Sequence, residues 1–157
     1  MYRVFLSYNT SRDEMVVVWR LQTLAAASGL HLEVLNQEQR ADWGIVTRII
    51  DEADAVIAFL TKQASKQVEN ELRYALSRKK PVIPIVERGV STKLINVLLQ
   101  GSGIPVFVLD PDNPGSMESG LADYLRKKRL DKEKRNAILA LAGTIAGLFL
   151  LQELTQS

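Results

Sequence analysis

The chain of 157 residues contains no cysteine and only one histidine, His31, and these two shortages exclude several kinds of chemistry. Without cysteine there is no disulfide framework, no thiolate metal site and no cysteine nucleophile. A single histidine cannot form the cluster that holds a catalytic zinc ion. We therefore expect no metal site and no bound cofactor. The lack of cysteine also fits a reducing compartment.

Net positive charge is confined to one short segment. Residues 1–125 carry 13 basic and 15 acidic side chains, so their net charge is −2 and we do not expect them to bind nucleic acid. Residues 126–135 hold seven Lys or Arg against Asp131 and Glu133, a net charge of +5. This distribution predicts a main domain over 1–125, a basic neck over 126–135 and an apolar helix over 136–154.

Five short apolar runs predict the strands of the main domain. They lie at residues 4–6, 32–35, 55–60, 81–86 and 105–109. Between them, apolar residues recur at helical spacing, as do Val68, Leu72 and Ala75. Connections of this length are right-handed crossovers, which predicts an α/β fold with a five-stranded parallel sheet and helices on both faces.

In such a sheet, ligands bind where the strands end. The loops at residues 8–12, 36–43 and 61–66 should therefore line the site. The first of these loops has no glycine, which excludes a dinucleotide-binding Rossmann motif. A phosphate-accepting receiver domain needs an acidic residue at the end of the third strand. Here Thr61 follows that strand and Asp54 precedes it, so this class is excluded as well.

Glu71 is the carboxylate whose position stands out. It flanks the apolar stripe that contains Val68 and Leu72, so we expect it at the edge of the domain. Glu69 is spaced four residues from Arg73 and is the more natural partner for a surface ion pair. Helical periodicity alone gives only slight support for a functional role of Glu71. The ordinary alternative is a solvated glutamate on the surface of a helix.

Two stretches of the chain resemble the Toll/interleukin-1-receptor (TIR) domain family. The run VFLSY at positions 4–8 is similar to the first conserved box of that family. Residues 54–86, DAVIAFLTKQASKQVENELRYALSRKKPVIPIV, are similar to its third strand, its serine-bearing loop, its E-L-x-x-A-L helix and its K-P-V-I-P-I strand. The resemblance covers roughly residues 1–125 and implies a TIR protein of the prokaryotic type, with a flavodoxin-like sheet and an added C-terminal helix.

The resemblance also implies an activity. In enzymatic TIR domains a glutamate takes part in cleaving the bond between nicotinamide and ribose in NAD⁺, and that position falls on Glu71. NAD⁺ would then be a substrate and not a cofactor. The reaction passes through an oxocarbenium-like state that a carboxylate can stabilise. Nicotinamide leaves as a neutral molecule, so a site without histidine or cysteine is adequate.

Five further residues are candidates for substrate binding: Tyr8, Asn9, Arg12, Trp43 and Gln67. Many enzymatic members have tryptophan where this chain has Gln67, four residues before the glutamate. Trp43 could supply an aromatic face instead, although it could equally pack at the start of a helix. Arg12 could meet a phosphate or lie on the surface.

Enzymatic members act after self-association through TIR–TIR contacts, which implies an NAD⁺-consuming signal generator in prokaryotic immune defence. The competing hypothesis is a scaffold without enzymatic activity that recruits partners by assembly at a membrane.

The C-terminal segment has no charge over the 17 residues 136–152, which is near the lower limit for a bilayer span. Gly143 and Gly147 form a small-xxx-small pattern. With the basic neck, the positive-inside rule predicts a cytoplasmic TIR domain anchored to the cell membrane. The alternative is a soluble helix packed on the domain or on a partner.

The chain starts directly in a strand-like run, so no secretory signal peptide is expected.

Overall fold

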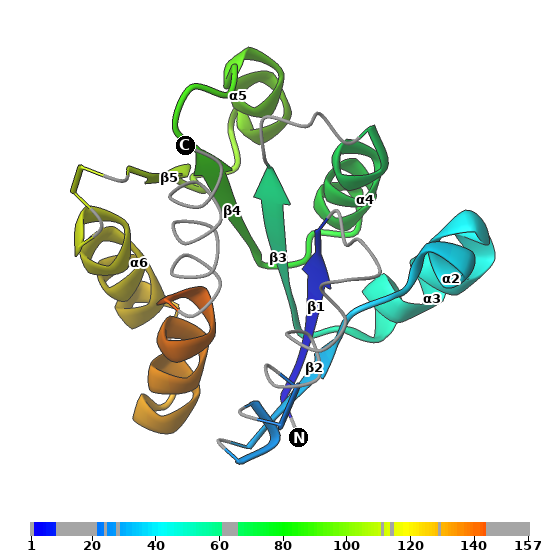
Figure 1. The fold of residues 1–157 in the computed structure, drawn as a ribbon, viewed down its shortest axis with the longest axis horizontal. Helices are drawn as coiled ribbons and strands as arrows, with labels where there is room; N and C mark the ends of the chain where they lie inside the picture. The colour runs from blue at the N-terminus through cyan, green and yellow to red at the C-terminus, as the bar shows by residue number, and fades with distance from the viewer. Residues whose placement is uncertain are drawn as a thin grey trace.

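The computed structural model describes residues 2–8, 22–23, 25–27, 29–60, 66–110, 112–113, 115–128 and 130–143. Its centre is one parallel sheet in the order β2-β1-β3-β4-β5 (Figure 1). The strands are β1 (Tyr2–Ser7), β2 (Leu30–Glu33), β3 (Ala55–Leu60), β4 (Val82–Glu87) and β5 (Phe107–Leu109). The predicted five-stranded parallel α/β fold is thereby confirmed.

Helices cover both faces of this sheet. They are α2 (Gln37–Ala41), α3 (Trp43–Glu52), α4 (Lys66–Ser77), α5 (Lys93–Leu99) and α6 (Gly115–Lys127), and residues 132–143 are also helical. Side chains of α3, α4 and α5 pack on one face. Those of α6 and of the helical residues 132–143 pack on the other, so the two groups flank the sheet in Figure 1.

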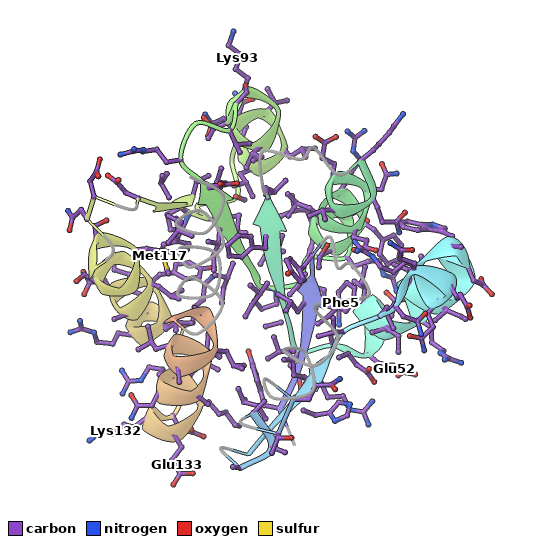
Figure 2. The ribbon with its side chains drawn as sticks, viewed as in Figure 1. Phe5, Glu52, Lys93, Met117, Lys132 and Glu133 are labelled. Atoms are coloured by element: carbon purple, nitrogen blue, oxygen red, sulfur yellow. The ribbon has the colours of Figure 1, made fainter. Side chains whose placement is uncertain are left out.

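Alternation along β1 divides its side chains between these faces. Val4 and Leu6 belong to the apolar cluster under α6, whereas Phe5 belongs to the cluster under α3 and α4. In Figure 2 Phe5 lies beside β1, on the side of α3 and α4. Because side chains two positions apart in a strand share a face, Ser7 lies on the same side as Phe5. The end of β1 therefore directs a hydroxyl toward α4.

The polar stretch 36–42, expected to be a loop, contains the short helix α2. Asn36 accepts a hydrogen bond from the backbone N–H of Gln39, whose side chain accepts one from the Asn36 backbone in return. This capping box satisfies the free amides at the helix start. Asp42 then ends α2 and caps α3. The polar side chains of residues 36–42 therefore stabilise a helical conformation of this stretch.

The C-terminal apolar segment differs from its expected form. Ala137, Ile138, Leu141 and Ala142 are buried in the cluster under α6. Their spacing forms one apolar stripe along a helix, which packs against the sheet side of the domain. Among the residues that the structure describes, no helix is long and apolar enough to span a bilayer. The predicted transmembrane helix is therefore not found there, and residues 144–157 lie outside the described part.

Candidate active site

Glu71 lies inside the protein, not at its edge. Its exposed fraction is 0%, and it shares the buried face of α4 with Val68, Leu72 and Ala75. The helical spacing that predicted the apolar stripe thus includes the glutamate itself. A buried carboxylate is costly unless hydrogen bonds or a counter-charge compensate it. Its surroundings supply both.

Three side chains donate four hydrogen bonds to the Glu71 carboxylate. Oε1 accepts from Ser7 Oγ at 2.6 Å and from Arg40 Nη2 at 2.9 Å. Oε2 accepts from Gln67 Nε2 at 2.9 Å and from Arg40 Nε at 3.2 Å. An ionised carboxylate offers about four acceptor positions. In this arrangement all four are occupied.

Arg40 forms the central ion pair of the site. Its guanidinium engages both oxygens of Glu71, the two-point geometry that strengthens arginine–carboxylate pairs. It also donates through Nη1 to the Tyr8 carbonyl. Only 8% of Arg40 is exposed, so water screens the pair weakly. The Arg40 carbonyl accepts from Gln67 Nε2 at 3.2 Å, which ties α2 to α4.

The four residues of this cluster come from three places where strands have ended. Ser7 is the last residue of β1, Arg40 follows β2, and Gln67 and Glu71 belong to α4, which follows β3. The site is therefore at the edge of the sheet where ligands bind in this kind of fold. We call Ser7, Arg40, Gln67 and Glu71 the carboxylate cluster.

Gln67 lies beside Glu71, whereas Tyr8 reaches the carboxylate cluster only through its backbone and its side chain packs against the cluster under α6. The Tyr8 carbonyl contacts Arg40, and its half-buried ring packs edge-on against Phe59, with ring centroids 6.3 Å apart. Asn9 and Arg12 lie outside the described residues.

Trp43 faces a different part of α4. It is 44% exposed, and its ring meets the edge of Tyr74 at a centroid distance of 5.9 Å. The two rings line an open groove with Asn70, Arg73 and Ser77. No residue of the carboxylate cluster lines this groove.

Sequence reasoning missed two members of the cluster. Ser7 stood in the quoted VFLSY run, and its period-two relation to Phe5 could have indicated that it faces α4. Arg40 carried no such signal, because it follows the polar residues 36–39 without any apolar repeat. The described residues hold no group of His, Asp or Glu arranged to bind a metal ion.

Comparison with known proteins gave the following matches. The family model described as TIR domain matches residues 4–110, a range that contains the whole carboxylate cluster. A CMP N-glycosidase from Clostridium botulinum, BcmB, has a similar structure, with a TM-score of 0.55, 20% identity, and coverage of 76% of this chain and 98% of that one. A flavodoxin mutant from Pseudomonas aeruginosa matches with a TM-score of 0.42 and 16% identity over 81% of this chain and 95% of its own. No curated protein sequence matches the chain.

Proposed function

The chain belongs to the TIR-domain family, and from that premise we propose that it is an NAD⁺ nucleosidase whose catalytic carboxylate is Glu71. The observation that carries the proposal is the position of Glu71, buried among polar donors where the strands end. Buried carboxylates are rare and cluster at functional sites. Prokaryotic immune defence is the biological setting that we propose for this activity.

The proposed reaction breaks the bond between the ribose and the nicotinamide nitrogen. The bonding electrons leave with nicotinamide, which becomes neutral, and positive charge develops on the ribose. The Glu71 carboxylate would bind the ribose hydroxyls and stabilise that charge. Ser7 and Gln67 would hold the carboxylate in place through the hydrogen bonds that they donate. Water or another hydroxyl then forms a bond to the sugar carbon and releases its proton to the solvent. The name of the similar N-glycosidase states a substrate bond of the same class.

The occupied acceptor positions imply a closed resting state. A ribose hydroxyl can bind Glu71 only if one of the present donors withdraws. Arg40 is the donor whose withdrawal the substrate can compensate, because the nicotinamide ring of NAD⁺ brings its own positive charge. Arg40 is carried by a helix of only five residues. We propose that self-association moves this segment away from Glu71 and so activates the enzyme.

The direct test is to incubate the concentrated protein with NAD⁺ and detect free nicotinamide by mass spectrometry. We expect release by the wild type and a loss of at least ~100-fold in Glu71→Gln, as for other groups that stabilise transition-state charge. Glu69→Gln is the matched control on the same helix and should retain activity. Wild-type turnover by a folded Glu71→Gln protein would refute the assignment.

The closed state has its own test. Specific activity of the wild type should rise with protein concentration. Arg40→Met, assayed at a temperature at which circular dichroism shows it folded, should already be active when dilute, because Arg40 then no longer competes with the substrate for Glu71. The same specific activity for wild type and Arg40→Met at every concentration would contradict the role of Arg40.

A scaffold without enzymatic activity is the second candidate. It is favoured by the complete occupation of Glu71 and by Gln67, which stands where many enzymatic members have tryptophan. Self-association without nicotinamide release at any concentration would establish this function.

A further inference from the structure

The flank formed by α6 and the helical residues 132–143 carries the densest cluster of positive charge in the chain. Its described cations form what we call the basic ridge: Arg126, Lys127, Lys128, Lys132, Lys134 and Arg135. In Figure 1 this flank lies on the side of the sheet away from α2 and α3. Lys132 and Glu133 point outward from its lower end in Figure 2.

Most of the ridge charge is available to a partner. Lys127, Lys128 and Lys132 are exposed, and none of them forms an ion pair with another described residue. Among the described residues, Arg126 and Lys134 form ion pairs only with carboxylates three positions away in the sequence, at 2.7 and 3.6 Å. Exposed pairs of this kind contribute little and exchange readily. The ridge therefore presents a net positive surface.

Two aromatic rings lie at the ridge, but its own lysines cover them. The Lys128 ammonium is 5.1 Å from the centre of the Tyr124 ring, and that of Lys134 is 5.4 Å from the Tyr2 ring. Tyr124 is also buried against Phe107. Proteins that hold single-stranded nucleic acid need open rings on which bases can stack. These rings are not open, and residues 1–125 are net negative, which would repel a long polyanion.

A flat anionic surface fits the basic ridge better than a nucleic acid does. A bilayer can touch one flank of a protein without approaching its negatively charged remainder. The sequence beyond residue 143 has one charged residue, Glu153, so its composition suits the membrane interface.

We propose that the basic ridge binds the surface of a bilayer that contains anionic phospholipids. Contact through this flank places the membrane away from α2, so the helix that carries Arg40 stays clear of the bilayer (Figure 1). The attachment is electrostatic and peripheral, and it does not depend on whether Glu71 is catalytic.

The test is co-sedimentation of the full chain with vesicles of phosphatidylcholine, with and without phosphatidylserine. At ~0.1 M salt the chain should bind only the anionic vesicles, and at ~1 M salt it should be released, because the screening length falls from about 10 to about 3 Å. Equal binding to both kinds of vesicle, binding that resists salt, or binding to RNA without binding to anionic vesicles would each overturn the proposal.

A matched pair of variants locates the surface. Lys132→Glu and Lys93→Glu make the same charge change, both at exposed first positions of helices, where an acidic residue is well tolerated. Figure 2 shows the two lysines at distant ends of the molecule. Lys132→Glu should weaken binding to anionic vesicles about five- to thirtyfold, whereas Lys93→Glu should leave it unchanged. Equal losses in both variants, with native circular dichroism, would show that net charge and not the ridge is responsible.

Discussion

Near the carboxyl ends of the strands, the two faces of the sheet are covered by side chains of different polarity. Under α6, side chains such as Leu6, Leu109 and Leu141 continue the apolar core. Under α4, the core begins with Phe5 and Leu72 but ends in the carboxylate cluster. In the described residues, the face under α6 is held together mainly by apolar burial, whereas the face under α4 also buries a hydrogen-bonded pair of charged groups.

This difference shows where stability and function lie in the molecule. Apolar burial contributes roughly 25 cal/mol per Å² and needs no particular geometry. A buried ion pair stabilises a fold little and requires every donor to be in place. The protein retains such a pair at the edge of the sheet where ligands bind, which argues that the pair serves the site more than the fold. Four experiments test this contrast, in order of decreasing effect.

Removing one partner of the buried pair should have the largest effect. Arg40→Met leaves the Glu71 carboxylate buried without its counter-charge, which should lower the free energy of unfolding by about 3–5 kcal/mol in urea titrations. The double variant Arg40→Met/Glu71→Met should recover most of that loss, because no charge then remains buried. A double variant as unstable as the single one would mean that the pair itself stabilises the fold.

On the apolar face, Leu141→Ala should cost about 2–5 kcal/mol, because it leaves a cavity among fully buried side chains. Leu139→Ala, the same substitution two positions away at a half-buried residue, should cost clearly less. Thermal unfolding of both variants checks this. Equal and small losses would mean that the helical residues 132–143 are not part of the core, and the contrast between the faces would fail.

Ser7→Ala should cost about 1–3 kcal/mol, because Glu71 loses a short hydrogen bond and stays buried. Ser77→Ala is the control, since that exposed hydroxyl donates only to the Tyr74 carbonyl at the end of α4. Urea unfolding should find the control close to wild type. A silent Ser7→Ala variant would mean that water enters the carboxylate cluster.

The smallest effect is expected at Asp51, a carboxylate exposed on α3. Hydrogen bonds from Tyr74 and then Arg78 hold the pKa of Asp51 below its ordinary value of 3.8. Because the pKa is lowered in the folded state, these contacts stabilise the protein above the unfolded pKa. That contribution is lost as the pH falls through the folded-state value. Asp51→Asn should therefore be nearly neutral at pH 7 and flatten the acid limb of a stability profile. A loss as large as that of Arg40→Met would erase the distinction between exposed and buried pairs.

The strands were predictable because their signal is local. The run from Ala55 to Leu60 is apolar at every position, as a strand covered on both faces requires, and the structure finds β3 over the same residues. The second strand was predicted at 32–35 and lies at Leu30–Glu33. Val34 and Leu35 are nevertheless buried. The apolar run at 32–35 therefore identified residues of the core correctly, but it did not give the limits of the hydrogen-bonded strand.

The site was predictable only in part. The resemblance to TIR domains singled out Glu71, and the structure adds that the residue is fully buried. Trp43 was a candidate for the same site and instead lines a groove with Tyr74, because Asp42 ends α2 and starts α3 just before it. Arg40 was not singled out, since its partner is 31 positions away in the sequence.

The sequence by itself determined the alternation of strands and helices, the parallel sheet and the position of the glutamate on its helix. All of these follow from apolar spacing or motifs within a few dozen residues. Only the tertiary structure decided that Ser7 and Arg40 converge on Glu71, and that part of the apolar C-terminal segment completes a core. The physical reason is that a hydrogen bond or a packed leucine depends on a partner distant in the chain, and local pattern carries no record of that partner.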